Sequence, residues 1–141
     1  MFLDRLSSVS SRIEGARALS LVAPDGIPVE SFSADGGLDL DALAAELISQ
    51  VRGIAQDNRD LEVGTVEQLS VSTDRMVLMV SALAAGYYLL LVLDQGASHG
   101  RARFELRRAR PLFAGGLEVL SPLSSPLFLT PSPGGVPVGP R

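Results

Sequence analysis

The feature that most constrains this chain is an uncharged stretch of 18 residues, MVLMVSALAAGYYLLLVL, at positions 76–93. That length is the lower limit for a helix that spans a membrane. Ala84-Ala85-Gly86 divides the stretch into two apolar runs of hairpin length, however, and polar turn residues flank it on both sides. We therefore expect two buried strands joined by a short turn, and no membrane span.

A wide apolar stripe with helical spacing precedes this hairpin. The positions that share the stripe are Leu40, Leu43, Ala44, Leu47, Ile48, Val51, Ile54 and Ala55. Asp39 or Asp41 can cap the start of the helix by accepting hydrogen bonds from its free N–H groups. A stripe of this kind normally faces the core, but its width also suits a second surface such as a dimer seam.

The remaining segments give shorter signals. Helices are expected at 2–13, from apolar residues spaced 4, 3 and 4 apart, and at 101–113. Strands are expected at 18–23 and 27–32, around a Pro24-Asp25-Gly26 turn, and at 66–72. The predicted order is α-β-β-α-β-β-β-α. This is an α+β fold, with helices packed on one five-stranded, mostly antiparallel sheet.

Composition changes near the end of the chain. We expect a domain over residues 1–115 and a flexible tail over 116–141, which is rich in proline, serine and glycine. Leu127-Phe128-Leu129 is an apolar island in this tail. It could be a docking peptide, it could fold back on the domain, or it could have no role.

Charge is distributed unevenly along the chain. Residues 1–100 contain 6 Arg and 14 Asp or Glu, whereas residues 101–110 contain 5 Arg and one Glu. An acidic body does not suit the phosphate backbone of nucleic acids, so we expect no nucleic-acid partner. The arginine-rich segment is interpreted as a solvated helix face or as a contact for an acidic protein partner.

Residue types that most enzymes need are scarce. The chain has no cysteine, no lysine and a single histidine, His99. A P-loop, a lysine Schiff base and a thiolate metal site are thereby excluded, and a catalytic zinc site is disfavoured. We predict that the protein is not an enzyme and uses no cofactor or metal. Residues 1–15 do not form a signal peptide, and the lack of cysteine fits the cytoplasm.

One segment matches a catalytic motif literally. Residues 96–100, GASHG, read G-x-S-x-G between a predicted strand and a predicted helix, which is the setting of a nucleophile elbow. A serine triad needs a histidine that reaches the serine from elsewhere in the fold, and here the only histidine follows Ser98 directly. A glycine-rich turn capped by Ser98 explains the match better.

Three segments, taken in order, resemble the roadblock (dynein light chain) family. They are FLDRLSSVSSRIEGARALSLVAPDGIPVESF at 2–32, VGTVEQLSVSTDRMVLMVSAL at 63–83, and YYLLLVLDQGASHGRARFELRRA at 87–109. The last is the most telling, because a strand, a glycine loop and a G-x-x-R-x-x-L helix start follow one another. The resemblance covers about residues 2–113, and it is strongest to MglB- and especially MglC-like bacterial members.

The resemblance implies a homodimer whose protomers pair through the long helix, Leu40–Ile54, and the strand Val66–Ser72. The implied interface residues are Leu43, Leu47, Val51, Ile54, Val66, Gln68 and Ser70. In MglC-like members the first hairpin turn contacts an MglB-like partner, and the matching positions here are Pro24, Asp25 and Ile27.

The resemblance also implies a function. Our first hypothesis is a non-catalytic adaptor that binds other roadblock proteins in a bacterial polarity or motility system controlled by a Ras-like small GTPase. The second is a GTPase-activating platform that binds the GTPase directly across its paired long helices. The third is a structural, light-chain-like subunit of a larger assembly.

Overall fold

The computed structural model describes residues 2–34 and 36–120, with residues 114–120 as backbone only. Its elements are α1 (Leu3–Ser11), β1 (Ala16–Val22), β2 (Pro28–Ser33), α2 (Leu40–Leu61), β3 (Gln68–Ser72), β4 (Met76–Ala82), the short 3-10 helix η1 (Ala84–Gly86), β5 (Tyr88–Asp94) and α3 (His99–Leu120). The predicted order of helices and strands is confirmed. The part of the predicted tail from residue 121 onward lies outside the described residues.

The five strands form one sheet in the order β2-β1-β5-β4-β3, and every pairing between neighbours is antiparallel. The uncharged stretch forms its central hairpin, in which β4 and β5 pair from Met76↔Asp94 to Ala82↔Tyr88. Within the described part of the chain, no helix is long and apolar enough to cross a membrane. The expected α+β fold is therefore confirmed.

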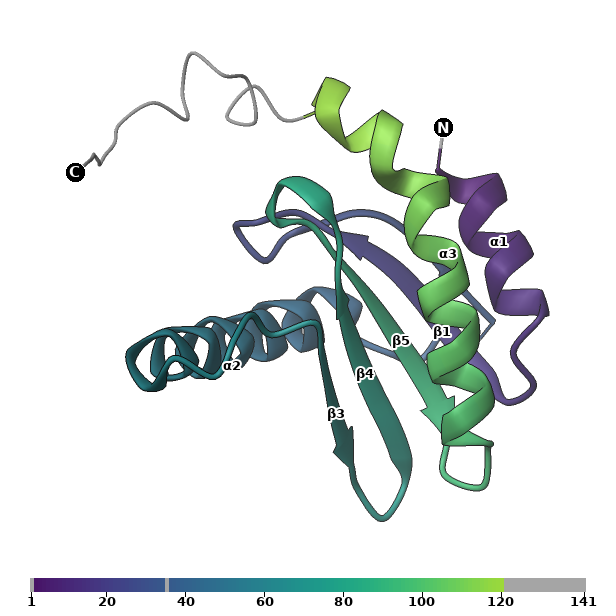
Figure 1. Ribbon diagram of the computed structural model, residues 1–141. Coiled ribbons are helices and arrows are strands. Elements are labelled where there is room, and N and C mark those ends of the chain that lie inside the picture. Colours follow the sequence, from purple (N-terminus) through teal and green to yellow (C-terminus); the bar gives the residue numbers. More distant parts are fainter. Residues whose placement is uncertain (1, 35, 121–141) are drawn as a thin grey trace.

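Helices cover both faces of this sheet (Figure 1): α2 lies on one face, and α1 and α3 lie side by side on the other. The central strands β1, β4 and β5 are consequently buried on both sides, which is why their sequences are almost continuously apolar. Because side chains alternate along a strand, each of these strands contributes to two separate hydrophobic clusters.

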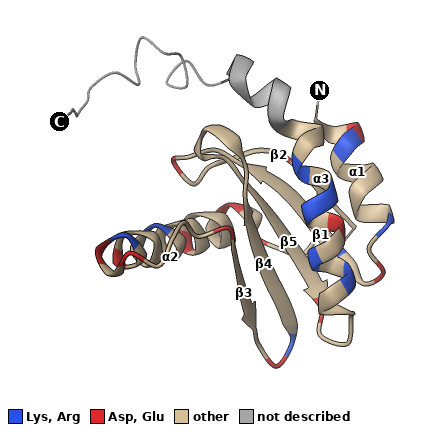
Figure 2. Ribbon diagram, viewed as in Figure 1, with Lys and Arg blue, Asp and Glu red and all other residues tan. Residues whose placement is uncertain are grey.

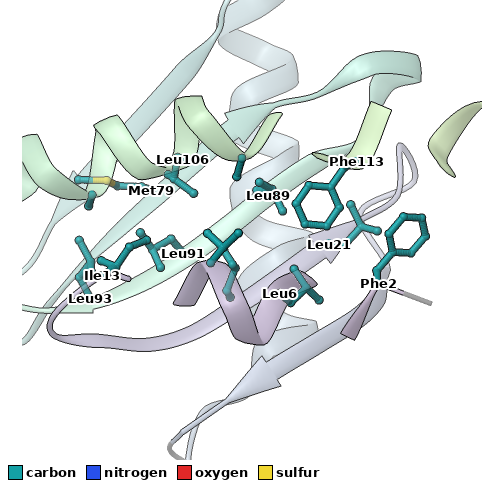
Figure 3. Close-up of a cluster of buried hydrophobic side chains, with 14 of the residues drawn as sticks. Phe2, Leu6, Ile13, Leu21, Met79, Leu89, Leu91, Leu93, Leu106 and Phe113 are labelled. Atoms are coloured by element: carbon teal, nitrogen blue, oxygen red, sulfur yellow. The ribbon is translucent and has the colours of Figure 1, made fainter. Parts of the chain in front are cut away.

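The larger cluster lies under α1 and α3 (Figure 3). The four residues that define the first predicted helix stripe, Phe2, Leu6, Val9 and Ile13, are all buried there. The second cluster lies under α2. Its members are Ala44, Leu47, Ile48 and Val51 from the helix and Ala18, Val22, Leu78, Val80, Leu90 and Val92 from the sheet.

Local chemistry sets the bounds of α2. The carboxylate of Asp39 accepts a hydrogen bond from the backbone N–H of Ala42 at 3.1 Å, which confirms the predicted cap. At the other end Glu62 adopts a left-handed conformation, with φ of 58°. The helix thus continues beyond Ala55, where its apolar stripe ends, through a polar segment to Leu61.

Candidate functional site

The strand β3 forms an open edge of the sheet. Among the described residues it pairs with β4 on one side only, and its sequence, Gln-Leu-Ser-Val-Ser, contains neither a charge nor a proline. Charged side chains and prolines are the usual devices that stop an edge strand from pairing with another chain. This edge therefore remains competent to accept a further strand.

The opposite edge, β2, is better protected. It starts at Pro28, which has no N–H to donate, and the register against β1 shifts beside it. The carboxylate of Glu30 on the same strand accepts a hydrogen bond from the backbone N–H of Phe2 at 2.8 Å. The residues at the start of α1 are thus tied to this edge, so β3 is the edge more open to a partner.

The C-terminal part of α2 projects beyond the sheet on the β3 side (Figure 1). After Val51, its last buried residue, the helix has little of its own chain to pack against. Ile54 is 37% exposed. Two apolar residues near the C-terminal end of α2 are more exposed, Leu61 at 71% and Val63 at 67%. Exposed apolar side chains of this size are typical of a protein-binding surface.

The structure divides the predicted dimer residues into two groups. Leu47 and Val51 are buried in the protomer's own core, and Leu43 and Val66 pack partly against it. Ile54 and Ser70 are exposed, whereas Gln68 is half-buried on β3 and its amide contacts the sulfur of Met79 at 3.9 Å. Sequence reasoning missed Leu61 and Val63, although two apolar residues in the polar run DNRDLEV are a recognisable signal.

The predicted partner-binding turn between β1 and β2 is well ordered by its own bonds. The Asp25 carboxylate accepts from the N–H of Ile27 at 3.0 Å, and the N–H of Gly26 donates to Ala23 O at 2.9 Å. Pro24 is half-buried, and its ring lies near Gly86 of η1, where an added Cβ would meet Cγ at 3.3 Å. The turn presents Asp25 and Ile27, the latter 63% exposed.

Ser98 of the G-x-S-x-G match caps α3. Its hydroxyl accepts from the N–H of Arg101 at 3.2 Å, as expected for a helix cap. A shallow pocket of about 510 Å³ lies beside it, lined by Glu14, Gly15, Asp94, Gly96, Ala97, Ser98 and Arg101. Among the described residues no group of His, Asp and Glu is arranged to hold a metal.

Charge divides the molecule by face (Figure 2). Arginines gather on α3, and acidic residues are prominent on α2 and around its ends. The exposed end of α2 carries acidic residues together with Arg59, and α2 lies on the opposite face of the sheet from the arginine-rich helix.

Comparisons with known proteins give this geometry a family context. The sequence matches no family model and none of the curated proteins. Solved structures do resemble it. MglC from Myxococcus xanthus is 33% identical, over 79% of this chain and 94% of that one, with a TM-score of 0.58.

Two further structures share the fold at lower identity. The gliding protein MglB from Thermus thermophilus is 22% identical, over 83% of this chain and 88% of that one, with a TM-score of 0.75. A Roadblock/LC7 domain from Streptomyces avermitilis is 18% identical, over 82% and 95%, with a TM-score of 0.71. The shared fold and the sequence identity to MglC thus indicate the same family.

Proposed function

The chain belongs to the roadblock/LC7 family as an MglB/MglC-like member, and from this membership we propose that it is a dimeric, non-catalytic adaptor. In this proposal it binds other roadblock proteins in a bacterial polarity or motility system that is controlled by a Ras-like small GTPase, and it acts in the cytoplasm. The observation that carries the proposal is the open β3 edge together with the exposed apolar end of α2, which projects beyond the sheet on the same side.

The shape and chemistry of this edge support self-association. Two β3 strands can pair antiparallel about a two-fold axis, which joins the two sheets into one and satisfies the unpaired backbone groups. The projecting end of α2 would then reach the partner protomer, where Ile54, Leu61 and Val63 lose contact with water. Burial of apolar side chains contributes about 25 cal/mol per Å².

Leu47 and Val51 have an indirect part in this dimer. They hold α2 on its own sheet, and so fix the position from which Ile54 meets the partner. The proposed strand pair contains the exposed Ser70 and the half-buried Gln68, both on β3. Val66, also half-buried, lies two residues before the strand. The proposed seam thus consists of a supporting layer, formed by Leu47 and Val51, and a contacting layer, formed by Ile54 and the residues of the open strand.

The β1–β2 turn is the proposed site for an MglB-like partner. Ile27 offers an exposed apolar anchor, and the bonds within the turn hold it in one conformation. A preformed turn loses little conformational entropy on binding, which favours recognition by a second protein. Asp25 and Pro24 position this anchor rather than bind through large surfaces of their own.

The adaptor role is favoured over turnover by the residues themselves. The chain has no lysine for a P-loop, and Ser98 is engaged as a helix cap beside the only histidine. The proposed functional surfaces are the open β3 edge, with its unpaired backbone groups, and the exposed apolar side chains of the α2 end and the β1–β2 turn. Surfaces of this kind suit association between proteins.

The direct test uses the purified full chain with an MglB-like roadblock protein and a Ras-like GTPase from the same genome. We expect binding to the roadblock protein and no acceleration of GTP hydrolysis by this chain alone. Acceleration by this chain alone would support an activating platform, and binding to neither protein would support a structural light-chain role. Either result would overturn the adaptor proposal.

A matched pair of variants sharpens that test. Ile27→Asp should weaken binding to the roadblock partner by about tenfold or more, as for a central anchor. Leu3→Asp places the same charge at an exposed apolar position on α1 and should bind like the parent chain. Equal affinities for both variants would exclude the turn as the contact.

A further inference from the structure

A buried carboxylate lies at the centre of the arginine-rich helix. Glu105 of α3 is only 2% exposed, and one of its oxygens, Oε1, accepts no hydrogen bond from the described residues. Arg101 Nε lies 3.4 Å from Oε2, and a terminal nitrogen of Arg108 lies 3.7 Å from Oε1. Because a buried carboxylate is costly unless its charge is compensated, these two ion pairs draw both guanidinium groups toward Glu105.

The same helix face carries exposed apolar side chains. Arg101, Phe104, Arg108 and Leu112 are spaced 3, 4 and 4 residues apart and so form one line along α3, which we term the α3 stripe. The guanidinium of Arg108 lies 5.7 Å from the ring centre of Phe104, which is 50% exposed, and Leu112 is also exposed. At 1.5 Å per residue the stripe is about 17 Å long.

We propose that the α3 stripe binds a short acidic segment of another protein, one that carries apolar side chains between its carboxylates. Both arginine side chains remain more than half exposed while Glu105 anchors them, so each has donors free for a carboxylate. Phe104 and Leu112 supply apolar contacts between and beside them. Arginine and aromatic residues are the types that dominate protein-binding hot spots.

Two further observations favour a peptide over a broad anionic surface. The stripe is confined to one helix, whereas residues 1–100 carry a net charge of −8 (6 Arg against 14 Asp and Glu). The stripe occupies about 17 Å of a single helix, which suits a short segment, whereas a membrane or a nucleic-acid duplex contacts a wider basic surface. The chain's own residues 121–141 contain no Asp or Glu, so they cannot supply the carboxylates.

The stripe is independent of the proposed dimer. It lies on the sheet face opposite to α2 (Figures 1 and 2), so pairing through β3 and α2 leaves it open. A dimer would present two such stripes, so a partner with two acidic segments would bind more tightly than a partner with one.

The test uses a fluorescein-labelled synthetic peptide of about twelve residues, the length of the stripe on a helix, with leucines flanked by glutamates. Anisotropy with the full chain should report binding, and the peptide with glutamine in place of glutamate should not bind. Phe104→Ala should weaken binding by about tenfold. Arg101→Gln should weaken it several-fold more than Arg103→Gln, an exposed control on the same helix with the same charge change.

Glu105→Gln distinguishes held arginines from simple charge attraction. This variant makes the stripe more positive, so attraction alone predicts tighter binding. If Glu105 fixes the arginines in place, binding should instead weaken several-fold, because their freedom must then be lost on association. Circular dichroism checks its fold, and Phe104→Ala tests the stripe at an exposed position if Glu105→Gln does not fold.

Three results would overturn the proposal. The first is equal binding of the glutamate and glutamine peptides, and the second is tighter binding by Glu105→Gln. The third is no peptide binding together with sedimentation on vesicles that contain phosphatidylserine, which would assign the stripe to a membrane surface.

Discussion

The ring of Phe2 stacks on the ring of Phe113, with 5.9 Å between their centroids and 29° between their planes. Both side chains are buried. Phe2 immediately precedes α1, and Phe113 belongs to α3, so the contact joins the two ends of the described domain (Figure 3). The two helices on this face thus depend on each other for burial, although more than a hundred residues separate these rings in sequence.

Phe113→Ala should therefore lower the free energy of unfolding by about 3–5 kcal/mol, since it removes a buried ring and leaves a cavity against Phe2. Urea denaturation of the variant measures the loss. Leu112→Ala is the adjacent control, because Leu112 is exposed and its truncation should cost less than about 1 kcal/mol. Similar losses for both variants would show that α3 does not pack as described.

Gly15 is a second position where two distant segments meet. Its φ is +88°, and a Cβ added to it would lie 2.8 Å from Cβ of Ala97, in the loop before α3. Gly15→Ala should destabilise the domain by at least about 1–2 kcal/mol, since left-handed backbone and steric overlap both oppose it. Thermal unfolding measures the change.

Gly96→Ala is the control for that substitution. Gly96 has no positive φ, and an added Cβ would meet nothing within 4 Å. This variant should unfold at the parent temperature or slightly above it, because alanine restricts the unfolded chain. A loss equal to that of Gly15→Ala would assign the effect to the loop and not to the close approach.

The cap of α2 gives a third prediction. Asp39→Ala removes the acceptor for the Ala42 N–H and should lower stability by about 1 kcal/mol in urea denaturation. Asp39→Asn retains an acceptor oxygen of the same reach and should keep most of that stability. If Asn and Ala cost the same, charge near the helix dipole, and not the hydrogen bond, stabilises this end.

Local patterns were sufficient to predict the elements of the fold. Burial of β4 and β5 on both faces explains their uninterrupted apolar runs, and the Asp39 cap is a short-range signal. The order of elements indicated one mostly antiparallel sheet, but no pattern predicted the order of strands within it. Such signals work because helix and strand periods act within a few residues.

Features that depend on distant packing were not predictable. Glu105 is charged and flanked by arginines in sequence, a pattern typical of a solvated helix face, yet it is buried. The periodicity of the α2 stripe also does not predict where the sheet beneath the helix ends. Val51 and Ile54 belong to the same stripe, but Val51 is the last buried residue of α2 and Ile54 is 37% exposed. The C-terminal part of the helix projects beyond the sheet (Figure 1).

That difference yields the prediction for the proposed dimer seam. Ile54→Asp should convert the dimer to a folded monomer, since it places a carboxylate in the contacting layer without entering the core. Val51→Asp should unfold the protomer, because an unpaired carboxylate would be buried among apolar side chains. Light scattering measures the mass, and circular dichroism separates monomer formation from unfolding. Ser49→Asp, at an exposed position on the same helix, adds the same single negative charge and is the control. A folded Ile54→Asp variant that keeps the dimer mass would exclude the end of α2 from the seam and leave the β3 edge as its only support.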